Sequence, residues 1–294
     1  MENNRRFPLI LSNFWIKIIA FITMTFDHIG FLMPDSYLAY AFRIIGRISL
    51  PLFIFLVFEG AMHTKNFNKY ALRLGIMASV ISIAIIGVAY LPAFKENSDR
   101  IKEEGNIFID LLLCAVTVYL LKQEKWYFKL LSILPLAFGI ASYIATAMDS
   151  CGCYGEILWL PFFLRSQYGF YPIIMCMFFY LAVVLTKAFC RYHSSISGID
   201  VENYKGSNFE RIVTNIFSIV AIVISTLVFY LVTINLPPQF FFLNIEVQLF
   251  ALISGAFILL YSGLRGYNKK WFQYGSYLYY PVHLIILYLI FAFI

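Results

Sequence analysis

The sequence predicts an all-α integral membrane protein, a single bundle of about nine or ten transmembrane helices. Hydrophobic residues make up 61% of the 294 residues and charged residues only 13%, about half the charged fraction of a soluble domain. Apolar runs of about 20 residues, the length that crosses a bilayer as a helix, recur along the chain. Because no long polar linker separates them, we expect one domain over residues 1–294.

Nine apolar runs define the expected helices in chain order. They lie at 14–33, 41–61, 71–92, 107–121, 127–147, 170–189, 212–234, 243–263 and 277–294. Residues 154–164 form a further apolar segment, which is short and contains Gly155, Glu156 and Pro161. This segment either crosses as a tenth helix or is re-entrant, entering and leaving the membrane on one side.

Basic residues in the loops predict the orientation, because cytoplasmic loops are enriched in Lys and Arg. With the N-terminus inside, the loops that hold Lys65 and Lys122 also lie inside. The basic segments 187–211 and 265–270 return to that side only if 154–164 is re-entrant. We therefore expect a cytoplasmic N-terminus and favour nine crossings with a re-entrant element over ten.

Composition also argues against several kinds of partner. The net charge of +6 comes from basic residues in short loops between spans, which is not the pattern of a nucleic-acid-binding surface. Among the five cysteines the one close pair is Cys151 and Cys153, and no histidine is nearby. We expect a lipid bilayer as the surroundings, no nucleic acid, no metal and no disulfide framework.

Asp27 and His28 lie side by side in the middle of the first apolar run. A carboxylate at that depth costs on the order of 3 kcal/mol, so such residues usually serve ion passage, proton relay or catalysis. An imidazole takes and returns protons near neutral pH, and a carboxylate can orient it. Successive helix residues point about 100° apart, so Asp27 reaches His28 only through water, the backbone or another partner.

The second run carries two polar pairs at helical spacing. Arg43 and Arg47 lie one turn apart, and Glu59 and His63 repeat that spacing at the other end. Paired guanidinium groups suit a phosphate or carboxylate ligand, although they also suit structural pairing with Asp27 and Glu59. The set favours group transfer from an anionic donor. The alternative is a proton-coupled transporter of an anionic small molecule, and a structural subunit of a secretion apparatus also remains open.

The order of these residues is more specific than their composition. The series is Lys17-Ile-Ile-Ala20, Asp27-His28-Ile29-Gly30, Arg43-Ile-Ile-Gly-Arg47, Pro51-Leu-Phe53, Glu59-Gly60, His63-Thr64, Arg73-Leu74, Asn106-Ile-Phe108 and Tyr280-Pro281-Val282-His283. It resembles the TraX family of bacterial multispanning membrane proteins, whose namesake N-acetylates F-pilin. That family is in turn similar to the broader membrane acyltransferases. The resemblance is densest over residues 15–75.

The resemblance implies an integral O- or N-acetyltransferase of the cytoplasmic membrane. Acetyl-CoA would be the co-substrate, and the acceptor would be an amine or hydroxyl of a pilin, peptide or glycan. By position, His28 would be the general base or would carry the acetyl group, and Asp27 would tune it. The donor or substrate would be bound by Arg43, Arg47, Glu59, His63, Arg73, Asn106 and His283.

Overall fold

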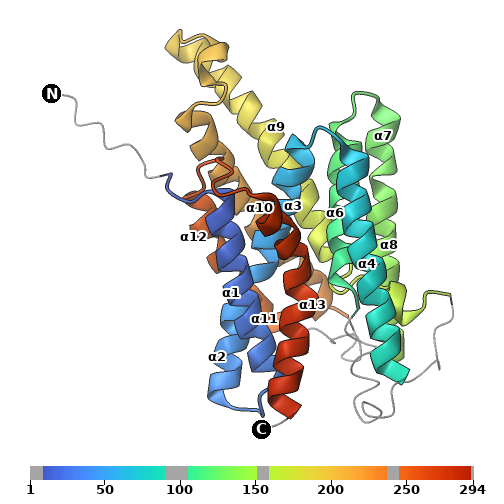
Figure 1. Ribbon diagram of the computed structural model, residues 1–294. Coiled ribbons are helices and arrows are strands. Elements are labelled where there is room, and N and C mark those ends of the chain that lie inside the picture. The colour runs from blue at the N-terminus through green and yellow to red at the C-terminus, as the bar shows by residue number, and fades with distance from the viewer. Residues whose placement is uncertain (1–8, 91–104, 151–158, 237–244, 293–294) are drawn as a thin grey trace.

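The computed structural model describes residues 9–90, 105–150, 159–236 and 245–292. In these residues the chain is a bundle of helices that run up and down side by side (Figure 1). The all-α membrane bundle expected from the sequence is therefore confirmed. Seven helical segments in the described ranges are long and apolar enough to cross a membrane.

The helices follow the apolar runs. They are α1 (Asn13–Leu32), α2 (Tyr37–Gly46), α3 (Ser49–His63), α4 (Phe67–Tyr90), α6 (Ile107–Lys122), α7 (Trp126–Leu131), α8 (Ile133–Ser150), α9 (Tyr171–Ser197), α10 (Asn208–Ile234), α11 (Ile245–Gln248), α12 (Ser254–Leu259) and α13 (Lys270–Ala292). Short 3-10 turns are η2 (Phe162–Leu164), η3 (Val201–Tyr204) and η5 (Leu249–Ile253). The run at 107–121 forms α6 over its full predicted length, whereas the run at 243–263 forms a shorter helical segment that ends at Leu259.

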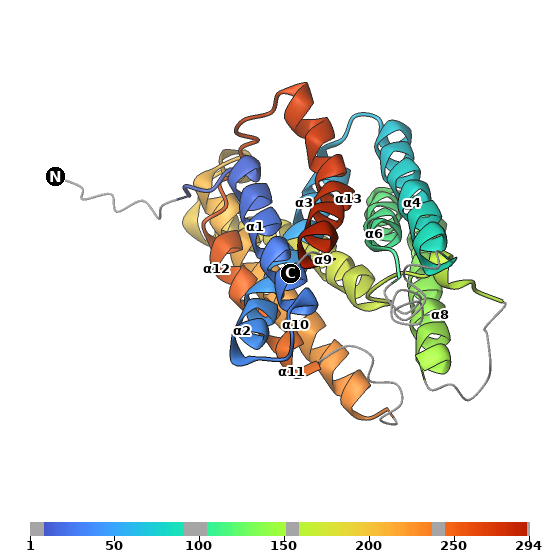
Figure 2. The same ribbon diagram turned by 60° about the horizontal axis from the view of Figure 1, so that its bottom comes forward.

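Two groups of helices flank a central pair. One group contains α1, α2 and α10–α12, the other contains α4, α6, α7 and α8, and α3 and α9 lie between them (Figures 1 and 2). The core is aromatic where α3 meets α9, since Phe55 and Phe58 both pack on Phe179 and all three are buried. The last helix, α13, packs along α1 and covers the front of α3 (Figure 1).

Glycine lets α1 and α2 approach closely. A Cβ on Gly30 would lie 2.7 Å from the carbonyl oxygen of Ala39, and a Cβ on Gly46 would overlap the side chain of Asp27. Ser36 begins α2, because its side chain accepts a hydrogen bond from the amide of Ala39. This contact places the polar residues of α2 directly against the middle of α1.

The segment before α9 enters the bundle as irregular chain. Residues 154–158 lie outside the described residues, and 159–164 contain a 3-10 turn instead of an α-helix. Arg165 pairs with Asp149 near the end of α8, whereas Gly169 packs against Gly139 nearer the start of α8. The described residues 159–164 therefore form no α-helix, and the Asp149–Arg165 pair returns the chain to the end of α8 before α9 begins.

Candidate functional site

Asp27 is held by two arginines of the second span. The Arg47 guanidinium donates to both carboxylate oxygens, at 2.6 and 2.8 Å, and both side chains are buried. A nitrogen of Arg43 lies 3.2 Å from the same carboxylate. The Asp27 carboxylate therefore joins α1 to the second span through these arginines. His28, the next residue, faces a different helix.

His28 instead bonds to a histidine from the end of the chain. Its Nδ1 atom lies 2.8 Å from Nε2 of His283, and Nδ1 of His283 lies 2.8 Å from the carbonyl oxygen of Tyr279. A carbonyl only accepts, so His283 donates through Nδ1 and, when neutral, accepts through Nε2. His28 must then donate through Nδ1, which leaves its Nε2 with a free lone pair, the form that a general base requires.

The second histidine is fixed in place by an aromatic contact. The Tyr279 ring stacks on the His283 ring, with centroids 5.0 Å apart and planes at 13°. The Tyr279 hydroxyl lies 2.7 Å from the hydroxyl oxygen of Thr25 on α1. These contacts tie α13 to α1 next to the histidine pair, so both rings are held by their surroundings.

A cavity of about 440 Å³ opens above this pair, between α1, α3, α4, α6, α13 and the loop before α13. Its charged lining residues lie near the starts of α1 and α4, near the end of α3 and in the loop before α13, whereas apolar residues line it farther along α1 and α13 and at the start of α6. The charged residues are Lys17, Glu59, His63, Arg73 and Arg265. At the inner end lie Met24, Phe53, Ile107, Phe108 and Tyr280. We call these two ends the rim and the floor of the cavity.

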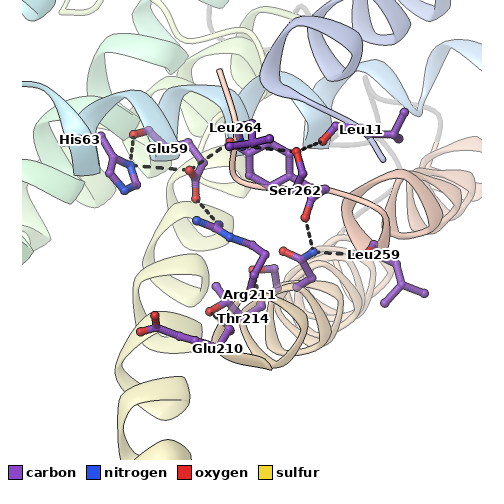
Figure 3. Close-up of polar contacts among 12 residues, drawn as sticks. Leu11, Glu59, His63, Glu210, Arg211, Thr214, Leu259, Ser262 and Leu264 are labelled. Atoms are coloured by element: carbon purple, nitrogen blue, oxygen red, sulfur yellow. Dashed lines mark hydrogen bonds and ion pairs between the residues drawn. The ribbon is translucent and has the colours of Figure 1, made fainter. Parts of the chain in front are cut away.

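Glu59 is the buried acid of the rim (Figure 3). A nitrogen of Arg211 on α10 lies 3.3 Å from its carboxylate, and the Tyr261 hydroxyl donates to the other oxygen at 3.2 Å. Burial raises the pKa of the Tyr261 phenol, so this donor keeps its proton. Nδ1 of His63 donates to the carbonyl oxygen of Glu59 at 2.9 Å. Glu59 therefore organises the rim by joining α3, α10 and the loop before α13.

Backbone bonds fix that loop beside the rim. The amide of Leu11 donates to the carbonyl oxygen of Leu260, and the amide of Ser262 donates back to Leu11. Gly263 has a φ of 76°, and a Cβ there would lie 2.7 Å from the Arg211 guanidinium. Only glycine accommodates both the backbone angle and the close approach. The N-terminal segment thereby holds Arg265 at the cavity entrance.

The cavity meets the histidine pair at Tyr280. Tyr280 lines the floor, and its ring centroid lies 6.0 Å from that of His28 and 5.7 Å from that of His283. The His28 ring is not part of the lining, so one aromatic layer separates it from the cavity. The arrangement suits a ligand that enters at a cationic rim and ends at Tyr280, the side chain that packs against His28.

The structure divides the residues expected to bind the donor into four groups. Glu59, His63 and Arg73 line the cavity, His283 binds His28, and Arg43 and Arg47 bind Asp27. Asn106 is buried outside the lining. Its amide donates to the Ala78 carbonyl at 2.7 Å and to Ser82, and its oxygen accepts from the Phe108 amide, which begins α6.

Sequence reasoning did not single out Lys17, Arg211, Arg265 or Tyr280 as site residues, although Lys17 and Tyr280 both belong to the motif series. The motif series was the signal that could have found Lys17 and Tyr280, whereas Arg211 and Arg265 lie in a stretch of the chain without motif residues. Within the described ranges no three His, Cys, Asp or Glu side chains gather as metal ligands.

Comparison with known proteins gives a family match over nearly the whole chain. The family model described as TraX protein matches residues 12–291. Over 65 residues the chain is 42% identical to a protein of Dichelobacter nodosus named "Probable fimbrial assembly protein FimC, serogroup H1". That stretch is 21% of this chain and 27% of the relative, so the chain spans about a quarter of the relative's length. No solved structure matches the chain.

Proposed function

The chain belongs to the TraX family, and from this premise we propose that it is a membrane-embedded acyltransferase. It moves an acetyl group from acetyl-CoA to an amine or hydroxyl of a membrane or extracytoplasmic acceptor. The observation that carries the proposal is the contact of Tyr280 with both the cavity and the His28–His283 pair. Tyr280 thus separates the proposed donor cavity from the proposed base, His28, by a single side chain.

The charges of the rim support a phosphate-bearing donor. Lys17, Arg73 and Arg265 come from three different segments and surround one entrance. Ammonium and guanidinium groups bind phosphate oxygens strongly, and coenzyme A carries three phosphates at the end remote from its thiol. The apolar floor suits the opposite end, where the thioester lies.

The proposed reaction needs no group beyond donor, acceptor and protein. The Nε2 atom of His28 takes the proton of the acceptor N–H or O–H, and the acceptor atom attacks the thioester carbonyl carbon. The carbon–sulfur bond breaks, and the proton passes from His28 to the departing thiolate. An amide or ester and free coenzyme A result. His283 acts as a positioning residue, because its bond fixes the tautomer of His28.

The arginines of the second span have a supporting role in this proposal. The Asp27–Arg47 pair and Arg43 join α1 to α2 immediately beside His28. A buried ion pair of this kind contributes more to a unique arrangement than to net stability. It sets the rotation of α1 and thereby aims His28 at α13.

Loop charges support an entrance that faces the cytoplasm. The α3–α4 loop, the end of α6 and the start of α13 lie at the end of the bundle where α1 begins (Figure 1). They carry Lys65, Lys122 and Lys269, whereas the loop after α1 contains Asp35. By the positive-inside rule this distribution supports a cytoplasmic location for the first end. We propose a protein of the cytoplasmic membrane with a cytoplasmic N-terminus, so that cytosolic acyl-CoA reaches the rim directly.

The name of one relative supports a choice of acceptor class. The Dichelobacter nodosus relative is named for fimbrial assembly, which favours a pilin-like peptide amine over a glycan hydroxyl.

Radiolabelled acetyl-CoA tests this function with purified protein in liposomes. We expect slow hydrolysis without an acceptor, labelling of an added acceptor peptide, and loss of both on His28→Ala. His193→Ala is the matched control, because that histidine bonds to Tyr204 far from the site. Uptake of an intact anion into sealed liposomes, without covalent change, contradicts acyl transfer and supports transport.

A further inference from the structure

The floor of the cavity lies at a fixed depth below the rim. On α1 the lining runs from Asn13 to Met24, which corresponds to about 16 Å at 1.5 Å per residue. On α13 it runs from Gln273 to Tyr280. When the rim cations hold the phosphates of a donor, the depth of the cavity therefore fixes how far its thioester reaches toward the floor.

Phe108 is the rigid part of that floor. Its side chain is buried, and its ring packs edge-on against Tyr280 with centroids 5.7 Å apart and planes at 86°. Its amide is held by the side chain of Asn106, which is itself anchored to α4 through Ala78 and Ser82. Because α6 begins at this anchored point, the backbone that carries the ring is held in place.

We propose that Phe108 restricts the donor to short acyl groups, because it closes the cavity immediately beyond the place where the thioester carbonyl must lie. The inference rests on the proposed function and deepens it by naming the residue that sets the chain length. Every acyl-CoA shares the same phosphates and arm, so longer acyl groups differ only in the methylenes that project beyond the carbonyl. In this cavity those methylenes meet the Phe108 and Tyr280 rings.

Removal of the Phe108 ring is expected to change chain-length preference. Each methylene that gains an apolar place contributes about fourfold in kcat/KM. In Phe108→Ala the ratio of kcat/KM for butyryl-CoA to that for acetyl-CoA should therefore rise roughly ten- to twentyfold over the parent. Phe108→Leu, which keeps more of the side-chain volume and perturbs folding less, should give an intermediate ratio.

Leu111→Ala is the matched control, because Leu111 lines the same cavity one helical turn nearer the rim. It removes a buried apolar side chain from the same helix without opening the floor, so the butyryl to acetyl ratio should stay within about twofold of the parent. Thermal unfolding in detergent accompanies each variant, and the ratio is measured only on folded protein.

The outcomes separate this inference from the proposed function. If the parent transfers acetyl groups in a His28-dependent way but neither Phe108 variant moves the ratio, the length restriction is wrong and the acyltransferase stands. A parent that transfers butyryl as well as acetyl, or a Leu111→Ala shift as large as that of Phe108→Ala, also overturns the restriction. If the parent transfers no acyl group at all, both proposals fail.

Discussion

Nδ1 of His28 lies 2.8 Å from Nε2 of His283, although the two histidines are 255 residues apart in the chain. One belongs to the first helix and the other to the last, so the ends of the chain close the site. Their bond is directional, since Nδ1 of His283 donates to the backbone carbonyl of Tyr279 and leaves Nε2 to accept from His28. The pair therefore presents one unprotonated nitrogen, on His28.

This asymmetry predicts unequal effects of the two histidines on rate. Loss of a general base typically lowers the rate by 10²- to 10⁴-fold, so His28→Ala should reduce kcat for acetyl transfer by about that factor. His283→Ala removes only the positioning bond and should reduce kcat less, by about tenfold. Steady-state kinetics with labelled acetyl-CoA measures both.

The double variant sharpens the comparison. If His283 acts through His28, then His28→Ala with His283→Ala should be no slower than His28→Ala alone. A further large loss of kcat in the double variant would contradict the assignment of His28 as the general base. A greater effect of His283→Ala than of His28→Ala would contradict it as well.

The Asp27–Arg47 pair predicts a stability effect. Removing one member of a buried ion pair leaves an uncompensated charge and costs about 3–5 kcal/mol. Asp27→Ala should therefore lower the free energy of unfolding in detergent by about that amount, and adding Arg47→Met should restore most of it. Chemical unfolding followed by circular dichroism gives the values.

A surface pair serves as the control for this cycle. Glu202 and Lys205 form an exposed ion pair at 2.6 Å, and Glu202→Ala should change stability by less than about 1 kcal/mol. If Asp27→Ala proves as mild as Glu202→Ala, the pair does not hold α1 against α2 as described.

The sequence predicts more of the fold than of the site geometry. Apolar length alone locates the helices, because the bilayer fixes how long a spanning helix must be. The spacing of Arg43 and Arg47 predicts a shared face, and their pairing with Asp27 was one of the open alternatives. Periodicity within a helix carries no information about which neighbour that face meets.

Contacts between distant segments account for what sequence reasoning missed. The bond between His28 and His283 depends on how α13 packs on α1, and no local pattern encodes that packing. Arg211 reaches Glu59 from another helix, and Arg265 reaches the rim because the backbone of Leu11 fixes its loop. Such residues look like ordinary inside-positive charges until the fold is known.

The rim predicts a split between substrate affinity and turnover. Arg73→Ala should raise KM for acetyl-CoA about tenfold with little change in kcat, because a phosphate contact binds ground state and transition state alike. Acetyl-pantetheine, which lacks the nucleotide phosphates, should show no such change. Lys205→Ala, outside the cavity, is the control. If Arg73→Ala raised KM equally for acetyl-CoA and acetyl-pantetheine, Arg73 would not be a phosphate-binding residue.

The charge distribution predicts opposite labelling of the two ends of the bundle. Lys65 and Asp35 are both exposed in short loops at opposite ends. In intact cells a membrane-impermeant thiol reagent should label Asp35→Cys more strongly than the parent. It should label Lys65→Cys more strongly than the parent only after the cells are lysed. The reverse pattern would turn the cavity entrance away from cytosolic acyl-CoA.

A structure of the protein with a non-hydrolysable acetyl-CoA analogue tests the central claim most directly. The account predicts that the analogue's phosphates lie beside Lys17, Arg73 and Arg265 and that its acyl carbonyl lies against Tyr280, next to His28. A ligand bound outside this cavity, or a fully occupied cavity whose acyl end points away from the histidine pair, would contradict it.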